Sequence, residues 1–151
     1  MAQGSEKPLK NAMLVLDTDH LSELEVRSSA GLRLLERLEK AGDNAFITAV
    51  TCEEQLRGWL AEINRHTKPR GQVTAYARLI RTIESLARWP VLPLDEDSAA
   101  MFEELERKRI RVGSNDLKIA SITLAHEATL LTRNSVDFAK IPGLTFENWL
   151  A

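Results

Sequence analysis

The sequence predicts an α/β fold built on a parallel sheet. Short apolar segments alternate along the chain with longer amphipathic ones, which is the pattern of strands separated by helices. Two apolar segments, residues 12–16 and 45–50, contain no charged residue and suit buried central strands. With 151 residues, 44% of them hydrophobic, the chain is long enough for one well-buried core, and we expect a single domain over residues 13–151.

In the first half of the chain, helical spacing follows each of these two segments. Residues 21–43 have the period of a helix, with Leu32, Leu35 and Leu38 as its apolar stripe and Gly42 as its end. A second helix is predicted from Thr51. A proline and a glycine within TKPRG, residues 67–71, interrupt it.

The second half continues the alternation. A short strand, VLPL, is expected at a sheet edge because Pro93 cannot donate to a central ladder. TLLT is predicted as a further strand because it is short and β-branched. The predicted helices cover residues 73–87, 97–109 and 115–126, VLPL and TLLT are residues 91–94 and 129–132, and residues 144–150 are a last strand or an ordered extension.

Composition indicates a cytoplasmic protein without a membrane partner. The single cysteine, Cys52, cannot form an internal disulfide, which favours a reducing compartment. Residues 1–12 are predicted to be a disordered polar tail, because they lack the apolar run of a signal peptide. No uncharged apolar stretch reaches the length of about 18 residues that suggests a membrane span. The net charge of −2 provides no overall basic field, so nucleic acid would need a local basic patch.

Acidic residues follow the predicted strands. Asp17 closes the first, Glu53 and Glu54 open the helix after the second, Asp116 opens a later helix, and Asp137 follows residues 129–132. The carboxyl ends of parallel strands meet at one edge of a sheet, where ligands bind. Carboxylates gathered there repel one another, so we expect a cation, and oxygen ligands favour Mg²⁺ or Mn²⁺. Taken singly, each acid could instead be a helix cap or a turn residue.

The pair formed by Asp17 and Asp19 also fits a different enzyme class. Phosphohydrolases of the haloacid dehalogenase type place two aspartates in this Asp-x-Asp pattern after a first strand. Such an enzyme also needs a lysine and a late acidic element, and neither occurs at a fitting place. A non-catalytic binding module is the second alternative, although a bare scaffold would not require all these acids.

Four segments resemble the PIN-domain ribonucleases of the VapC toxin type. They are LVLDTDHLSEL, ITAVTCEEQLRG, RVGSNDLKIASITLAHEATLLTRNSVDF and GLTFENWL. The resemblance implies a three-layer α/β/α fold with a mainly parallel sheet and an endoribonuclease that depends on Mg²⁺ or Mn²⁺. It also implies homodimers and inhibition by a cognate antitoxin, so the chain would be the toxin of a toxin-antitoxin pair.

The same resemblance assigns the family's acids to Asp17, Glu54, Asp116 and Asp137. Glu54 matches rather than Glu53 because the family's glutamate stands four residues before a glycine, here Gly58. We expect Asp17 and Asp116 to hold the metal, and Glu54 and Asp137 to bind it directly or through water. The predicted accessory residues are Thr18, Asp19, Thr132 and Asn134. Asp19 stands where the family commonly has Asn, and a helix cap is its expected role.

Two surfaces complete the expectations. RNA would be held by basic residues that lead towards the acidic edge, with the solvation of helix ends as an equally weighted alternative; these are Arg57, Arg65, Lys68, Arg107, Lys108 and Arg109. An antitoxin segment would enter a groove between the helices that flank TKPRG, near Trp59, Leu60, Tyr76 and Leu79.

Overall fold

A computed structural model of the protein describes residues 12–42 and 44–151. Its centre is a five-stranded sheet in the order β3-β2-β1-β4-β5, and every pair of neighbouring strands is parallel. The strands are β1 (Leu14–Leu16), β2 (Ala45–Thr48), β3 (Val91–Leu92), β4 (Thr129–Leu131) and β5 (Thr145–Glu147). The predicted α/β class and parallel sheet are confirmed, and β3 lies at the sheet edge as Pro93 indicated.

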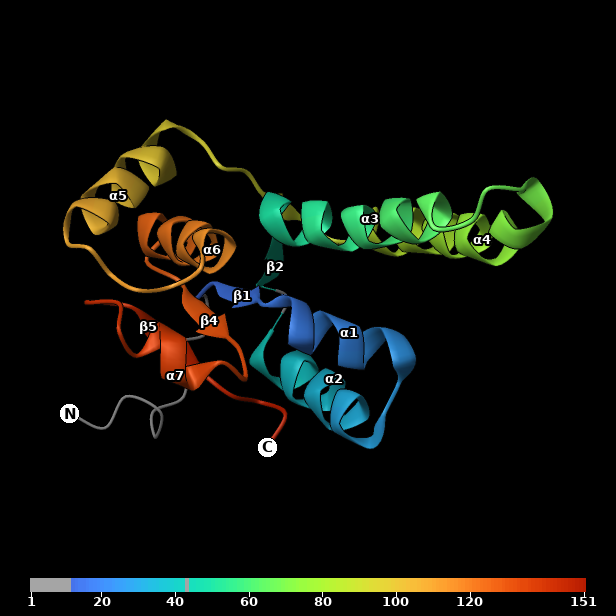
Figure 1. Ribbon diagram of the computed structural model, residues 1–151. Helices are drawn as coiled ribbons and strands as arrows, with labels where there is room; N and C mark the ends of the chain where they lie inside the picture. The colour runs from blue at the N-terminus through green and yellow to red at the C-terminus, as the bar shows by residue number, and fades with distance from the viewer. Residues whose placement is uncertain (1–11, 43) are drawn as a thin grey trace.

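Helices connect the strands and cover the sheet (Figure 1). They are α1 (Thr18–Val26), α2 (Ser29–Ala41), α3 (Ala49–Asn64), α4 (Pro69–Leu86), α5 (Glu96–Arg107), α6 (Ser114–Ala125) and the short α7 (Ser135–Phe138). The predicted helices around residues 73–87, 97–109 and 115–126 are therefore confirmed, with ends that differ by a few residues. In the part of the chain that the structure describes, no helix combines the length and the apolar character needed to cross a membrane.

The core consists of two apolar clusters on opposite faces of the sheet. Val15 of β1 and Leu130 of β4 belong to the cluster beneath α5 and α6, whereas Leu14 and Leu131 belong to the cluster beneath α1 and α2. This division follows from the alternation of side chains along a strand, which points neighbouring residues to opposite faces. The result is the expected three-layer α/β/α arrangement.

The prediction of one helix over residues 21–43 was wrong. Arg27 has a left-handed backbone with φ of 54°, and the Ser28 side chain caps a new helix, α2, by accepting the Gly31 N–H. A Cβ atom at Gly31 would lie 2.0 Å from the Glu23 carbonyl oxygen, so α2 packs directly on the backbone of α1. Gly42, with φ of 95°, ends α2 as predicted.

The apolar stripe assigned to this helix was also partly wrong. The structure buries Leu34 and Leu38, while Leu32 and Leu35 are 51% and 43% exposed. The close approach of α2 to α1 at Gly31 fixes which face of α2 turns inward. Leu34 and Leu38 are four residues apart and lie on that face.

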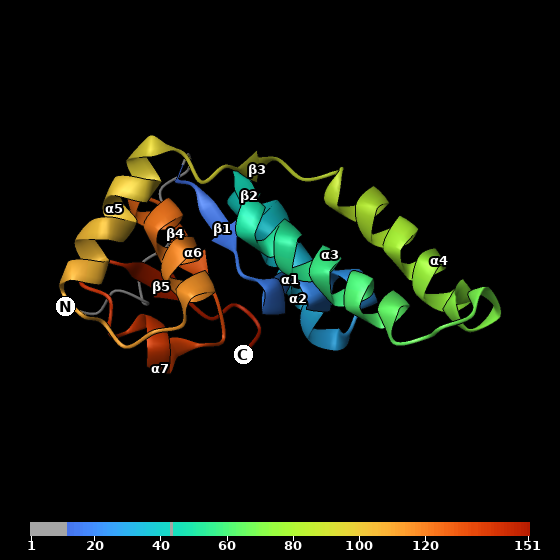
Figure 2. The ribbon, with the colours of Figure 1, turned by 45° about the horizontal axis from the view of Figure 1, so that its top comes forward.

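Helices α3 and α4 form an antiparallel hairpin that extends away from the sheet (Figure 2). Helix α3 begins at Ala49 rather than Thr51, because the Thr48 side chain caps it by accepting the Thr51 N–H at 3.1 Å. The predicted break between the two helices is confirmed, but it lies at residues 65–68 rather than 67–71, because Pro69 opens α4 and Gly71 lies within it. The tail predicted over residues 1–12 lies outside the described residues except for Ala12.

Candidate active site

The candidate site lies at the carboxyl ends of two adjacent strands, β1 and β4, which are followed by α1 and α7. Asp17 follows β1 directly, and its backbone N–H donates to the Leu131 carbonyl at 2.9 Å. Thr132 follows β4 and donates its hydroxyl to Asp17 Oδ2 at 2.7 Å. In the strand order β3-β2-β1-β4-β5, this is the point at which the chain changes direction across the sheet, and such points are where parallel sheets bind ligands.

Seven residues at this edge line a cavity of about 430 Å³, here called the acidic cavity; they are Asp17, Thr18, Asp19, Glu54, Gln55, Asp116 and Asn134. Three of the four predicted acids therefore face one space, although they lie far apart in the sequence. Asp137 and Thr132 do not line the cavity. Asp137 reaches it through Asn134, and Thr132 supports Asp17 from beneath.

Asp17 forms the floor of the acidic cavity. It is 7% exposed, and its oxygens accept hydrogen bonds from the Thr18 N–H at 2.8 Å and from the Thr132 hydroxyl. Burial raises the pKa of Asp17 to about 6, and the neighbouring charges of Asp19 and Asp116 act in the same direction. Within the described part of the chain, both hydrogen-bond donors to this buried carboxylate are neutral.

Amide and hydroxyl groups tie the other acids to the same cavity. Glu54 accepts from the Thr18 hydroxyl at 2.9 Å and from Asn115 Nδ2 at 3.2 Å. Asn134 Nδ2 donates to Asp116 at 3.2 Å and to Asp137 at 3.1 Å. These shared donors draw the carboxylates of separate elements together.

The pKa values of Asp116 and Asp137 are shifted in opposite directions by their surroundings. Burial and the charges of Glu54 and Asp137 raise the pKa of Asp116. The pKa of Asp137 is lowered by its hydrogen bonds from Asn134 and Lys140. Asp116 lies in the first turn of α6 but does not cap it, since Gly113 holds the N-cap position. The helix-cap alternative for Asp116 is therefore wrong.

The expected capping role of Asp19 is also wrong, because Asp17 caps α1. Asp19 instead accepts the Arg133 N–H at 2.9 Å and contacts His20 Nδ1 at 2.6 Å. Although burial opposes its ionisation, these hydrogen bonds hold the pKa of Asp19 below its usual value. His20 is fully buried, and its Nε2 accepts the Trp149 N–H at 3.1 Å. The ring proton is therefore on Nδ1, which donates a hydrogen bond to Asp19. Asp19 thus links the cavity to the end of the chain.

Sequence reasoning missed Asn115 and Gln55. Asn115 supports Glu54 from the residue next to Asp116, and that adjacency was the available signal. Gln55 lines the cavity beside Glu54 and donates to Glu25 of α1 at 3.2 Å. A glutamine after a glutamate in a helix carries no comparable pattern.

The donor set suits a hard divalent cation, because it consists of carboxylate, hydroxyl and amide oxygens without a nearby thiol or imidazole that faces the cavity. Within residues 12–42 and 44–151, no three His, Cys, Asp or Glu side chains form a ready-made metal site. Burial is the main cause that raises the pKa values of Asp17 and Asp116, and repulsion from the charges of neighbouring acids adds to it. A cation in the acidic cavity would relieve that repulsion.

The predicted basic residues lie outside the acidic cavity. Arg57 pairs with Glu53, Arg65 with Glu62 at 3.0 Å, and Arg107 with Glu104 at 3.5 Å, each on its own helix. Lys68, Lys108 and Arg109 are exposed. Their role in RNA binding stays a prediction.

A family model described as PIN domain matches residues 14–144. The chain belongs to the PIN-domain family. The match covers β1 to β4 and all seven helices that the structure describes, and it ends one residue before β5 begins. The acidic cavity is therefore formed entirely within the PIN domain.

Known relatives support the assignment to the PIN-domain family. Ribonuclease VapC5 of Mycobacterium tuberculosis is 30% identical over 135 residues, which span 85% of this chain and 87% of that protein. Ribonuclease VapC2 of Rickettsia felis is 52% identical over 46 residues, 30% of this chain and 34% of that protein. A crystal structure of VapBC-5 from Mycobacterium tuberculosis, a member of the VapBC family of toxin-antitoxin systems, contains a chain that is 27% identical. That match has a TM-score of 0.59 and covers 91% of this chain and 97% of the other.

Proposed function

We propose that this PIN domain is a metal-dependent endoribonuclease that hydrolyses RNA phosphodiester bonds. The observation that carries the proposal is the convergence of Asp17, Glu54 and Asp116 on one cavity at the carboxyl edge of the sheet. The relatives named ribonuclease support the reaction class. Neither the haloacid dehalogenase alternative nor a non-catalytic module gains support from the family match.

In this proposal Asp17 and Asp116 would hold a divalent ion, with Glu54 and Asp137 binding it directly or through water. The ion would be Mg²⁺ or Mn²⁺, and when bound it would activate water and neutralise charge on phosphoryl oxygens. Thr132 and the Thr18 N–H fix the Asp17 carboxylate. The Thr18 hydroxyl and Asn115 fix Glu54, which can accept a proton from an attacking water. The Asn134 amide donates to both Asp116 and Asp137 and so keeps these two carboxylates side by side.

Two measurements test this assignment together. Calorimetric titration with Mn²⁺ should show heat of binding for the parent protein, and the heat should fall sharply for Asp116→Asn. The same pair is then incubated with RNA and Mg²⁺, with Asp116→Asn as the control for contaminating nucleases. If the parent binds no Mn²⁺ and cleaves no more RNA than the variant, the proposed active site is wrong.

We infer further that the protein is the toxin of a toxin-antitoxin pair and binds an antitoxin protein. The likeness to the VapBC-5 structure supports this inference. Of the four apolar residues expected in an antitoxin groove, Trp59 lines a cavity beside α1, whereas Leu60, Tyr76 and Leu79 do not. Leu60 and Tyr76 are 52% and 50% exposed.

Growth measurements test the toxin assignment. Induced expression of the parent protein should arrest a bacterial host, and co-expression of the small open reading frame beside its gene should restore growth and co-purify. Absence of both effects would count against an antitoxin. The expected homodimer is tested separately by light scattering of the purified chain.

A further inference from the structure

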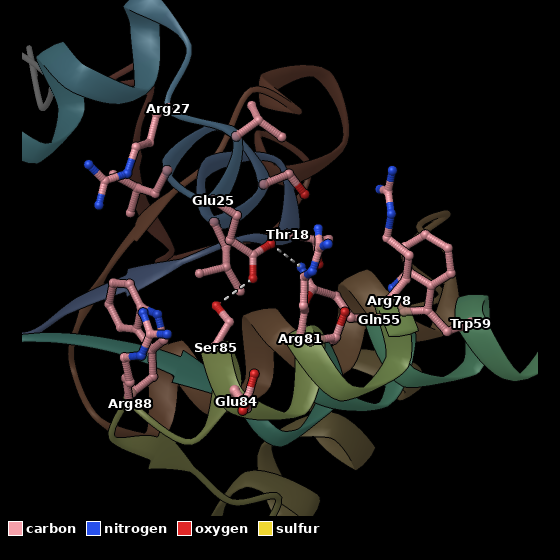
Figure 3. A pocket seen from close by; sticks show the side chains of 16 residues that line it. Thr18, Glu25, Arg27, Gln55, Trp59, Arg78, Arg81, Glu84, Ser85 and Arg88 are labelled. Atoms are coloured by element: carbon pink, nitrogen blue, oxygen red, sulfur yellow. Dashed lines mark hydrogen bonds between the residues drawn. The ribbon is translucent and has the colours of Figure 1, made fainter. Parts of the chain in front are cut away.

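A second cavity, of about 720 Å³, shares two lining residues with the acidic cavity. Figure 3 shows the side chains that line this second cavity. The cavity lies between α1 and the α3–α4 hairpin and is here called the arginine cavity. Thr18 and Gln55 line both cavities, so the two spaces meet at the start of α1 and the second turn of α3. A ligand long enough to pass these residues would occupy both.

Four arginines line this second cavity: Arg27, Arg78, Arg81 and Arg88. All four are exposed. Within the described part of the chain, none of their guanidinium groups forms an ion pair. This contrasts with Arg57, Arg65 and Arg107, each paired with a glutamate of its own helix. The cationic groups of the arginine cavity are free to meet an anionic ligand.

Among the residues that the structure describes, only two acids line the same cavity, Glu25 and Glu84. Glu25 is held by other groups, since it accepts the Ser85 hydroxyl at 2.7 Å and Gln55 Nε2 at 3.2 Å, as Figure 3 shows. The cavity therefore keeps an excess of positive charge although the whole chain has a net charge of −2. Such a local excess attracts a polyanion even when the global field does not.

Aromatic rings add a second recognition element. Trp59 and Trp89 line the cavity, and the Arg78 guanidinium lies 5.7 Å from the centre of the Trp59 ring. Arginines that track a backbone, interleaved with rings on which bases stack, are the combination that proteins use to hold single-stranded nucleic acid. An apolar peptide would gain little from four unpaired guanidinium groups.

We propose that the arginine cavity binds a single-stranded segment of the RNA substrate on one side of the cleaved bond. Its arginines hold backbone phosphates, and Trp59 offers a ring for base stacking. The segment passes Thr18 and Gln55 to bring the scissile phosphate into the acidic cavity. This inference rests on the proposed ribonuclease function and adds to it the place where the substrate strand is held.

Binding is measured in EDTA, so that cleavage does not interfere, with a labelled, unstructured single-stranded RNA of about 12 nucleotides, within the range of known site sizes. Alanine is introduced separately at Arg78, Arg81 and Arg88. For each phosphate contact removed, the slope of log affinity against log salt should fall by about 0.7, and affinity at low salt should fall about fivefold. Arg33→Ala on α2 is the matched control, because Arg33 is also exposed and lies outside both cavities.

Two further readouts separate a binding role from loss of structure. Arg81→Ala and Arg88→Ala should melt at the temperature of the parent, since no ion pair is lost. Arg78→Ala also loses the contact of its guanidinium with the Trp59 ring, so a small fall in its melting temperature is expected. With Mn²⁺ present, they should raise KM for the long RNA, whereas kcat and the cleavage of a substrate of about three nucleotides should change little. Trp59→Phe should keep most of the affinity that Trp59→Ala loses, because a ring remains for stacking.

The outcomes are distinguishable. If the parent cleaves RNA but the arginine variants match Arg33→Ala in affinity and salt slope, the arginine cavity is not the RNA subsite and the proposed activity stands. If the variants lose only the binding of a protein partner while RNA binding is intact, the cavity is a peptide site and the proposal is wrong. If the parent itself neither cleaves nor binds RNA, the proposed function fails as a whole.

Discussion

The acidic cavity and the arginine cavity meet at two residues but carry opposite unpaired charge. Asp17, Glu54 and Asp116 accept hydrogen bonds only from neutral donors, and no cationic side chain of the described residues lies within ion-pair distance of them. The arginines of the adjoining cavity have no acidic partner there. Among the described residues, therefore, neither region has an oppositely charged side chain that neutralises it. An RNA strand with a divalent ion would supply the opposite charge to both.

The largest expected effect separates the two regions by chemistry. Asp116→Asn should lower RNA cleavage by more than about 100-fold, because it removes a proposed metal ligand rather than a supporting group. Its melting temperature in EDTA should equal or exceed that of the parent, since repulsion from Glu54 and Asp137 is relieved. Added Mg²⁺ should stabilise the variant less than the parent. Calorimetric scans with and without Mg²⁺ measure both effects.

Asp116→Ala is the companion variant. Gly113 holds the N-cap of α6, so alanine at position 116 should not impose the cost of about 1 kcal/mol that loss of a capping side chain brings. A clear fall in melting temperature in EDTA for both variants, with cleavage intact, would make Asp116 a structural residue.

The acidic cavity should also control how stability depends on pH. Asp17 has a pKa of about 6 in the folded protein against an ordinary value of 3.8, which corresponds to about 3 kcal/mol less favourable ionisation in the folded state. The folded protein therefore binds more protons than the unfolded chain between these values. Metal-free stability should fall as pH rises from about 4 to 6, and the full cost should be present above that range.

Urea denaturation in EDTA at several pH values measures this slope, and Asp17→Asn should remove the part that Asp17 contributes. The raised pKa of Asp116 acts in the same direction, so the slope that remains should fall further in the double variant with Asp116→Asn. The pKa values of Asp19 and Asp137 are lowered in the folded protein, so these two carboxylates stabilise the fold at higher pH. Their contribution to stability is lost only as the pH falls below the ordinary value of 3.8. They do not obscure the window between 4 and 6. An unchanged slope in Asp17→Asn would mean that Asp17 is not the strained group.

How far the sequence predicts the site is clear from these residues. The rule that parallel strands end at one edge placed Asp17, Asp116 and Asp137 together, and the family resemblance selected Glu54. The role of Asp19 could not be predicted, because its partners, His20 apart, come from Arg133 and Thr132 on a distant strand end. The hydrophobic spacing of residues 21–43 likewise could not reveal the break at Arg27 or the inward face of α2.

The arginine cavity was beyond the sequence for a related reason. Arg27 lies at the end of α1, whereas Arg78, Arg81 and Arg88 lie on or after α4. Periodicity gives the face of a helix but not the distance between two helices. The basic residues that looked prominent in the sequence are instead clustered along single helices, where three of them pair with neighbouring glutamates.

A smaller effect on cleavage is expected from substitution of Asp19. This substitution tests whether some acids at the cavity edge support the fold while others bind metal. Asp19→Asn leaves one acceptor oxygen for donors from His20, Arg133 and Thr132. Loss of a hydrogen bond to a charged group should reduce stability by about 1 to 3 kcal/mol, and hydrogen exchange of the Trp149 N–H should become faster. Cleavage should persist, since Asp19 is not among the proposed ligands. Loss of cleavage with stability unchanged would instead make Asp19 part of the metal site.

The smallest expected effect sharpens the charge comparison from the other side. Glu25 places a negative charge among the arginines, and Glu25→Gln removes that charge while its amide oxygen can still accept the Ser85 hydroxyl. An exposed charge contributes about 0.2 to 1 kcal/mol, so RNA affinity in EDTA should rise about 1.4- to fivefold at low salt and return towards the parent value at high salt as screening grows. Glu103→Gln is the matched control and should change affinity less, because Glu103 is an exposed acid of α5 outside both cavities.

Equal effects of the Glu25→Gln and Glu103→Gln substitutions would show that only the net charge of the protein matters. A weaker affinity in Glu25→Gln would mean that the hydrogen bonds of Glu25 to Ser85 and Gln55, rather than its charge, shape the arginine cavity for RNA.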